Sequence, residues 1–380
     1  MSYFYKHNTN IYISKETYNN ANAGNTVFLN VKDFSYNQAS NIDRVSRNTL
    51  DPNQERVVDP YLSTINPVSF SLTTYILPTL DTNVTSPEEY LWTSLMGVDG
   101  QITNGADSSV IDFADGNTAS LQELTIWFLD PSNTEGGRRL DQAIIDSADI
   151  NFDINGIAEI TWEGRALDMV EYNTQPAAFT DYTNQTNYLK NRLSTLSVTS
   201  GSSFDMALTG GNVKFNNNNT FYSRTQIGET TVPVGHYTGN RTIDGELNVY
   251  MRAGTNRSVD LFNQILTNAS LSTYEDSYAN ITINIGGTTS PQYVTITIPQ
   301  VLFDIPKQNF DILSKNKEFL IGIGKEQLAV VHKSPSDVEA GDCFVIFNHL
   351  NLLEVGIKNG HAAQLLGMQY DSPIWIKFSG

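Results

Sequence analysis

The chain contains one cysteine, Cys343, so it cannot form an internal disulfide. It has no uninterrupted apolar run long enough to cross a membrane, and its opening residues, MSYFYKHNTN, lack the apolar core of a signal peptide. These absences predict a protein that is made and kept in a cytoplasm, with no membrane partner.

Basic residues are also scarce. The 23 Lys and Arg are outnumbered by 41 Asp and Glu, which gives a formal net charge of -18. Such a chain repels phosphates, so binding of nucleic acid through a basic patch is not expected. Only 17% of the residues are charged, and Asn, Thr, Ser and Tyr are abundant, which favours strands and turns over long surface helices. A chain of 380 residues can hold two or three domains.

The stretch from Val68 to Gly97 carries the clearest pattern. VSFSLTTYI alternates apolar and polar residues, which predicts a half-buried strand. SPEEYLWTSLMG then predicts a helix, with Ser86 as N-cap, Glu89 completing a capping box and Gly97 at its end. The residues predicted to pack this helix onto a core are Leu91, Trp92, Leu95 and Met96.

The same strand and helix pattern recurs from Ile243 to Asn268. The helix SVDLFNQILTN repeats the apolar spacing of the first one, with Leu261, Phe262, Ile265 and Leu266 as the predicted packing residues. Four positions of the first half each have an equivalent position in the second half. The number of residues between the two equivalent positions falls slowly from 179 to 160 along the chain, and it changes only in loops. We interpret this as a tandem duplication, although two unrelated amphipathic helices would show a similar stripe.

Two long polar segments, residues 37–67 and 216–240, precede the two strand and helix units. Loops of this length inside a compact domain are usually functional or disordered. Their charged residues and one histidine are the candidates for contacts between subunits: Arg44, Arg47, Asp51, Glu55, Arg56, Asp59, Arg224, Glu229 and His236. It is equally consistent with the sequence that these residues belong to solvated surface loops without a role in subunit contacts.

The rest of the chain sets the predicted boundaries. Residues 149–164 predict a hairpin with an Asn155-Gly156 turn. Its alternation predicts that Ile150, Phe152, Ile154, Ala158, Ile160 and Trp162 point inward. The segments YVTITIPQVLFDI and EFLIGIGK are expected to form the equivalent hairpin in the second half. The predicted parts are a loosely packed N-terminal arm (1–25), a first domain (26–170), a linker (171–190), a second domain (191–327) and a small C-terminal β extension (328–380).

The sequence gives little support for a catalytic site or a metal site. The acidic residues from Asp149 to Asp153 superficially suggest a calcium loop, but apolar residues interleave them and Trp162 stands where the last ligand would be needed. Asp342, Cys343, His349 and His361 fit no standard zinc spacing. We therefore expect no enzyme activity, no cofactor and no metal.

The order of strand, long loop, strand SFSLTTYI, helix PEEYLWTSLMG, strand LTIWF and hairpin DINFDINGIAEITWEG resembles the tail tube proteins of long-tailed bacteriophages. The resemblance covers roughly residues 26–327. It implies a mainly β fold with two tandem β-sandwich or barrel domains, each flanked by one α-helix. In that family six domains form a ring around a lumen, rings stack into a tube, and DNA passes through without specific binding.

If each chain supplies two such domains, three chains complete a ring with pseudo-sixfold symmetry. The resemblance thus predicts a virion tail protein that is assembled in the host cytoplasm and whose main partner is itself. Tail sheath, tape-measure, baseplate and tail-terminator proteins are further partners that it implies. Two alternatives remain open: a hub ring at the tail end or baseplate, and a carbohydrate-binding β module of a tail fibre or spike.

Overall fold

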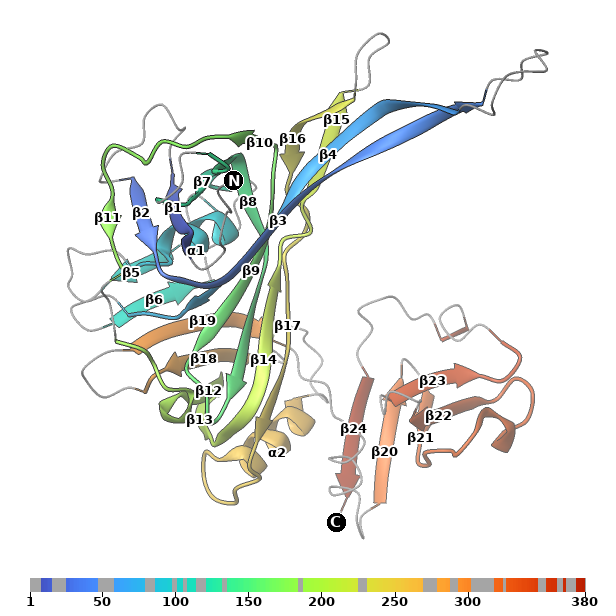
Figure 1. The fold of residues 1–380 in the computed structure, drawn as a ribbon. Helices are drawn as coiled ribbons and strands as arrows, with labels where there is room; N and C mark the ends of the chain where they lie inside the picture. The colour runs from blue at the N-terminus through green and yellow to red at the C-terminus, as the bar shows by residue number, and fades with distance from the viewer. Residues whose placement is uncertain are drawn as a thin grey trace. The chain divides into compact units, whose positions relative to one another are not determined.

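A computed structural model describes residues 8–15, 25–46, 58–78, 86–97, 101–104, 108–113, 121–131, 135–183, 187–224, 231–268, 279–287, 293–301, 318–323, 326–347, 353–360, 365–366 and 374–379. The described chain is mainly β with two α-helices, which confirms the predicted fold class (Figure 1). Within these residues no helix is long and apolar enough to span a membrane.

The chain divides into two compact units. The first comprises Met1–Leu196, Leu208–Tyr250 and Thr282–Ile298, and the second comprises Ser197–Ala207, Met251–Ile281 and Pro299–Gly380. Part of the second half of the sequence therefore belongs to the same unit as the first half. The predicted boundaries at residues 170, 190 and 327 stay a prediction.

The main sheet of the first unit has eleven strands. Its central path runs β11-β2-β1-β7-β8-β9-β4-β3, and β14 joins it by pairing with both β8 and β17. The strands are β1 (Asn10–Ser14), β2 (Thr26–Leu29), β3 (Val31–Ser46), β4 (Val58–Tyr75), β7 (Leu124–Leu129), β8 (Arg138–Asp153), β9 (Glu159–Ala166), β10 (Asp168–Glu171), β11 (Thr180–Asp181), β14 (Leu208–Asn216) and β17 (Thr242–Val249).

Six of these strands form a continuous antiparallel layer in the order β3-β4-β9-β8-β14-β17. One row across this layer is apolar throughout: Phe34, Leu72, Trp162, Ala148, Phe215 and Ile243. Because successive residues of a strand point to opposite faces, the neighbouring row faces the other way. The layer thus has one core face, built by strands from both halves of the sequence.

The helix α1 (Glu89–Met96) packs on this core face. The Trp92 ring lies 4.8 Å from the Trp162 ring and 5.9 Å from the Phe215 ring, edge-on in both cases. Leu91, Leu95 and Met96 are fully buried.

The start of α1 differs from the prediction. The helix begins at Glu89, its N-cap residue is Glu88, and no side chain caps it. The Ser86 hydroxyl instead donates to the buried Glu88 carboxyl group at 3.2 Å, and Glu89 pairs with Lys15. Gly97, with φ of 109°, follows the last helical residue, where the sequence places the end of the helix.

A second sheet in the first unit contains the consecutive strands β18-β19-β6-β5. Here β19 runs parallel to β6, and β5 and β6 are antiparallel. A separate pair, β15 and β16, is antiparallel. The strands are β5 (Gln101–Asn104), β6 (Ser108–Asp112), β15 (Thr220–Arg224), β16 (Val232–Tyr237), β18 (Ala279–Ile285) and β19 (Tyr293–Val301); the 3-10 turn η2 (Asn191–Leu193) lies near the end of β8.

The second unit contains the helix α2 (Ser258–Asn268), which packs beside β13 (Ser202–Met206), the strand next to β12 (Thr195–Ser200). Of the predicted α2 packing residues, Leu261 is buried and Phe262 half-buried, while the side chains of Ile265 and Leu266 lie outside the described residues. A small β core surrounds Ile321 and Val345. The remaining elements are β20 (Glu318–Ile323), β21 (Glu326–Leu328), η4 (Pro335–Asp337), β22 (Cys343–Phe347), β23 (Leu353–Ile357) and β24 (Ile374–Ser379).

Three local expectations were wrong. Residues 10–14 are not a loose arm but a buried strand paired between β2 and β7. Residues 37–46 and 58–67 are strand rather than loop, and the second predicted loop likewise contains β15 and β16. Nothing in the sequence indicates these strands, because a projecting hairpin needs no apolar face and so shows no alternation. In the described residues β20 pairs with β21 and β24, so EFLIGIGK does not form the expected second hairpin with β19.

Candidate assembly surfaces

The face of the six-stranded layer opposite α1 is polar. One row across it contains Asp33, Thr73, Thr161, Asp149, Lys214 and Asp244, in register with one another. The next row contains Ser35, Ser71, Glu163, Ser147, Asn216 and Thr242. We call this surface the polar face. It continues without interruption across the β8–β14 junction between the two halves of the sequence.

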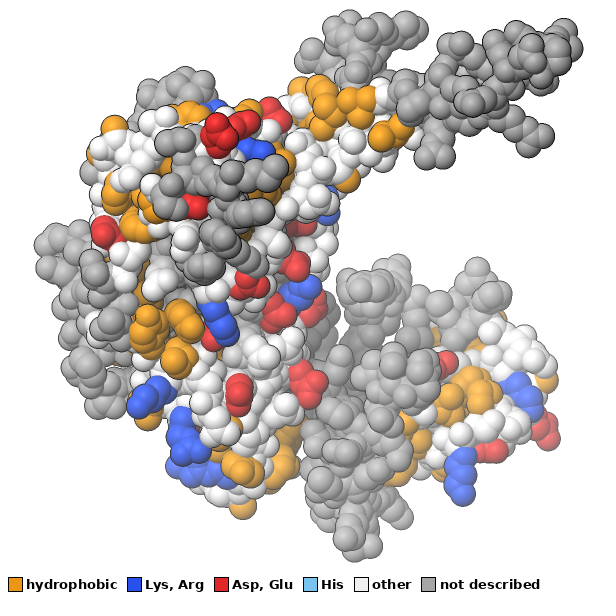
Figure 2. All heavy atoms as spheres, in the orientation of Figure 1, with side chains coloured by type: hydrophobic (Ala, Val, Ile, Leu, Met, Phe, Trp, Pro, Cys, Tyr) orange, Lys and Arg blue, Asp and Glu red, His pale blue; other side chains and the backbone are white. Residues whose placement is uncertain are grey.

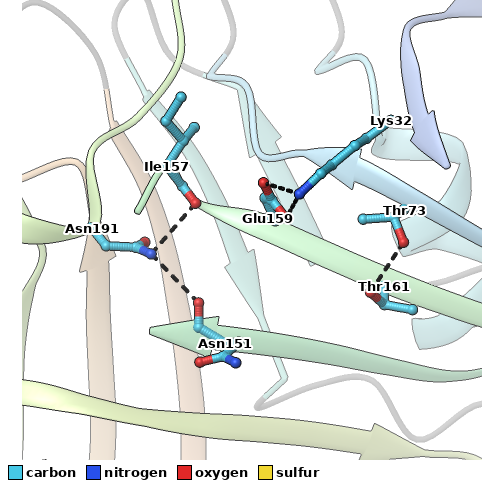
Figure 3. Close-up of polar contacts among 7 residues, drawn as sticks. All are labelled: Lys32, Thr73, Asn151, Ile157, Glu159, Thr161 and Asn191. Carbon is cyan, nitrogen blue, oxygen red and sulfur yellow. Dashed lines mark hydrogen bonds and ion pairs between the residues drawn. The ribbon is translucent and has the colours of Figure 1, made fainter. Parts of the chain in front are cut away.

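Side chains on the polar face bind one another across the strands (Figure 3). Lys32 Nζ donates to both carboxylate oxygens of Glu159, at 2.7 and 2.6 Å. The Thr73 and Thr161 hydroxyls lie 3.2 Å apart. Cross-strand pairs of this kind stabilise a sheet modestly and order its side chains. The polar face is therefore a surface on which side chains of neighbouring strands bind one another.

The polar face is also acidic. Its acidic residues are Asp33, Asp146, Asp149, Asp153, Glu159, Glu163, Asp244 and Glu246, and its basic residues are Lys32, Arg165 and Lys214. The Lys32–Glu159 pair and the Arg165–Asp146 contact of 3.8 Å neutralise part of this charge. Several carboxylates remain exposed to solvent, so the surface repels polyanions.

Two hairpins project from the layer in the same direction (Figure 1). The first arm is the outer part of β3 and β4, and the second arm is β15 and β16. The amide of Ile65 donates to the Thr231 carbonyl at 2.9 Å, and the Thr231 amide donates to the Ser63 carbonyl at 3.3 Å. These bonds hold the two arms side by side, although more than 150 residues separate them in the sequence.

The described part of the chain places four of the predicted contact residues on these two arms. Arg44 and Asp59 lie on β3 and β4, opposite Pro60 and Val45, and Arg224 lies on β15 opposite Val232. The side chains of these three residues are outside the described part. Arg47, Asp51, Glu55, Arg56 and Glu229 lie wholly outside the described residues. The structure thus brings the two predicted segments together but leaves their contacts as a prediction.

His236 is set apart from the other predicted contact residues because it is half-buried at the base of the second arm. Its ring lies 5.6 Å from the Phe221 ring, and its Nδ1 is 3.9 Å from Glu123 Oε1. Burial lowers the pKa of His236, and the nearby Glu123 carboxylate raises it by less. The position of His236 indicates a structural contact between the second arm and the rest of the first unit.

The second arm is anchored to α1 by a buried polar cluster. Arg241 donates to the carbonyls of Leu95 at 3.1 Å and Met96 at 2.6 Å, and to Asn217 Oδ1 at 3.0 Å. The fully buried Asn217 also donates to the Leu95 carbonyl at 2.8 Å. The helix has no basic residue in its own last turn, so Arg241 supplies the positive charge that a helix C-terminus favours.

The sequence reasoning missed both the polar face and this anchor. Alternation within β9 and β14 was the available signal for the polar face, but only the strand order shows that their polar residues share one surface. Nothing in the sequence marks Arg241, because the two α1 carbonyls that it binds are backbone groups about 145 residues away.

Of the metal and thiol candidates of the sequence, His349 and His361 lie outside the described residues. Among the described residues, no group of three or more His, Cys, Asp or Glu side chains is placed to hold a metal ion. Cys343 lies in β22, and burial raises the pKa of its thiol above the ordinary value, which disfavours the reactive thiolate.

The surfaces described above define a mainly β protein with an extended polar sheet face and projecting hairpins. The chain is 25% identical over 357 residues to the tail tube protein pb6 of Escherichia phage T5, a match that spans 88% of this chain and 73% of that protein. The predicted resemblance to phage tail tube proteins is thereby confirmed. A family model described as the SAM hydroxide adenosyltransferase C-terminal domain matches residues 300–375.

Proposed function

We propose that this protein is a structural, non-enzymatic component of a phage tail, where it polymerises into the tube through which the genome leaves the virion. The observation that carries the proposal is the six-stranded layer, which has one polar, acidic face and one core face covered by α1. A wall of this kind presents to DNA a polar surface on which carboxylates outnumber basic side chains. The similarity to a tail tube protein over most of the chain supports the same role.

The polar face suits a conduit because of its charge. DNA carries one negative charge per phosphate, and a wall with an excess of carboxylates does not hold it. Two of the three basic side chains on this face, Lys32 and Arg165, each lie beside a carboxylate, so the face offers few cations for transient binding of DNA. The polar face therefore lines the lumen, and α1 lies on the outer side of the wall.

Each ring contains three chains under this proposal. Two observations support it: the two halves of the sequence repeat one strand and helix pattern, and each half contributes one arm and part of the same layer. Both ends of the layer, β3 and β17, are edge strands in the described residues, and open edges invite pairing with other chains. Three copies of a two-part chain give a pseudo-hexameric ring with no open edges.

The arms make the contacts between stacked rings. Assembly takes place in the host cytoplasm and ends in the virion tail, where sheath, tape-measure, baseplate and terminator proteins are candidate neighbours. Residues 300–375 match a domain named for an adenosyltransferase, but a match to about a fifth of the chain does not make the whole protein an enzyme.

The test is electron microscopy of the purified full-length protein in negative stain, combined with native mass spectrometry. Long tubes built from three-chain rings are expected. Rings of six chains would contradict the trimer. Single rings that never stack would favour a hub at the tail end or baseplate, and monomers that bind glycans would favour a fibre or spike module.

A further inference from the structure

The turn between β8 and β9, residues 154–158, presents unusual apolar surface. Ile154 is 40% exposed and Ile157 is 41% exposed, and Leu193 of the adjacent turn η2 is 57% exposed. The exposed side chains of Lys190 and Arg192 flank them. We call these five residues the turn patch. Large aliphatic side chains gathered at one place on a soluble surface mark an interaction site more often than scattered ones do.

The turn patch is held rigidly by backbone bonds. The Ala158 amide donates to the Leu189 carbonyl at 2.8 Å, and the Asn191 amide donates to the Gly156 carbonyl at 3.1 Å. The side-chain amide of Asn191 donates to the Asn151 and Ile157 carbonyls, both at 3.5 Å (Figure 3). The two turns therefore form one preformed surface, which loses little entropy when a partner binds.

The turn patch lies at the end of the layer opposite the arms. Along the β4–β9 pair, Tyr75 is opposite Glu159, the first residue after the turn. Tyr75 ends β4, whereas the first arm is built by the start of β4, where Val58 pairs with Ser46. One end of the layer thus carries the arms and the other end carries the turn patch.

The first arm carries apolar surface of its own. Ile42 and Leu62 are cross-strand partners, and they are 59% and 44% exposed. Figure 2 shows hydrophobic side chains at the surface of the projecting arms. We call Ile42 and Leu62 the arm pair.

We propose that the turn patch is the docking site for the arm pair of a second copy of this chain, stacked along the tube. The inference rests on the proposed function and extends it by naming the acceptor surface. Two different apolar surfaces at opposite ends of one rigid layer give a head-to-tail contact, which repeats without limit and so builds a filament. Burial of the exposed aliphatic side chains supplies the driving force, because removing apolar area from water is favourable.

The first test uses the full-length chain with Ile157→Asp and Leu193→Asp combined. A charge on each apolar side of the turn patch is expected to abolish tubes while three-chain rings persist in negative-stain images. The matched control is Val330→Asp with Leu365→Asp, which places the same charges on aliphatic side chains that are 55% and 67% exposed. The control is expected to form tubes like the unmodified chain.

The second test keeps the apolar surfaces nearly intact and reports proximity. In a Cys343→Ala background, one preparation carries Ile42→Cys and another carries Leu193→Cys. Tubes grown from the mixture are expected to give cross-linked dimers with a short bismaleimide, whereas each preparation alone is not. Absence of the dimer in mixed tubes would overturn the assignment of the arm pair.

The outcomes separate this inference from the proposed function. Normal tubes from the charged turn-patch variant would overturn the inference and leave the proposed function standing. Folded monomers from that variant, with unchanged circular dichroism, would assign the patch to ring closure and also overturn it. If the unmodified chain forms neither rings nor tubes, the proposed function fails, and the inference fails with it.

Discussion

The guanidinium of Arg241 lies 2.6 Å from the carbonyl oxygen of Met96, the last residue of α1. Arg241 comes from the segment between the second arm and β17, so the second half of the sequence closes the helix of the first half. Burial lowers the pKa of the Arg241 guanidinium, but an arginine stays protonated at neutral pH. The bond couples the position of the second arm to the core of the first unit.

Arg241→Ala should destabilise the protein by roughly 2–4 kcal/mol, because it removes a charged hydrogen-bond donor and leaves the carbonyls of Leu95 and Met96 without it. Arg241→Lys should recover part of the loss. The measurement is the free energy of unfolding from urea titration. The control, Arg192→Ala at an exposed position, should change it by less than about 0.5 kcal/mol. Equal effects of the two alanine variants would refute this role.

The buried carboxyl of Glu88 predicts a pH dependence of stability. Burial raises its pKa from 4.5 to about 8 in the folded chain. Below pH 4.5 both states are protonated. As the pH rises from about 4.5 to about 8 the unfolded chain releases the proton while the folded chain keeps it, so stability falls by an amount on the order of a few kcal/mol. Above about pH 8 the difference is constant.

Glu88→Gln should remove most of this slope, because the amide is uncharged and still accepts the hydrogen bond from the Ser86 hydroxyl. The variant should be more stable than the unmodified chain at pH 8 and about equal to it at pH 4. Urea titrations at several pH values measure this, with the exposed Glu171→Gln as control. A variant that keeps the full slope would show that another group is responsible.

The sequence predicts which residues of a strand are buried, but it does not predict which strands pair. Alternation in VSFSLTTYI predicts correctly that Phe70 and Leu72 are buried and Ser69 is exposed, because side-chain period alone fixes the faces of a strand. The same reasoning does not identify partners. Val213 of β14 pairs with Ile150 of β8, yet either residue could pair with many other alternating strands.

The hairpin at Asn155-Gly156 shows a second limit. The β8–β9 hairpin is confirmed, and Ile150, Phe152, Ile160 and Trp162 are buried as predicted. Ile154 was predicted to point inward but is 40% exposed, because the turn spans residues 154–158 rather than two residues. Alternation continues in the sequence past the point where the strand ends, so it overestimates the buried face.

Leu91→Asp should prevent the first unit from folding. Leu91 is fully buried on the face of α1 that packs against the layer, and an unpaired carboxylate there costs several kcal/mol. Size-exclusion chromatography and circular dichroism should show aggregated or unfolded protein. Asn248→Asp places the same side chain on the polar face and should be tolerated. Soluble rings of Leu91→Asp would contradict the placement of the helix against a shared core.

Charge reversal on the polar face tests the conduit. Glu163, Asp244 and Glu246 are exposed, so changing all three to Lys should leave tubes intact but make them retain double-stranded DNA. Retention should fall steeply with salt, because each phosphate contact releases a counterion. Co-sedimentation of labelled DNA with tubes measures it. The control reverses Glu135, Asp168 and Glu171, which lie off the polar face and should not retain DNA; equal retention by both would argue against a luminal polar face.

Shortening the first arm tests its role in stacking without disturbing the layer. Asn41 and Thr64 are cross-strand partners at the base of the arm, so residues 42–63 can be replaced by Asn-Gly, a two-residue turn that closes antiparallel strands. The part of β3 and β4 that carries the apolar row remains, and folding should be retained. Rings are expected to form and tubes are not, because the deletion removes the arm pair, which is proposed to dock on the next copy of the chain. Negative-stain images of the shortened chain beside the unmodified one decide the matter: tubes of ordinary length would mean that ring stacking depends on the layer itself and not on the first arm.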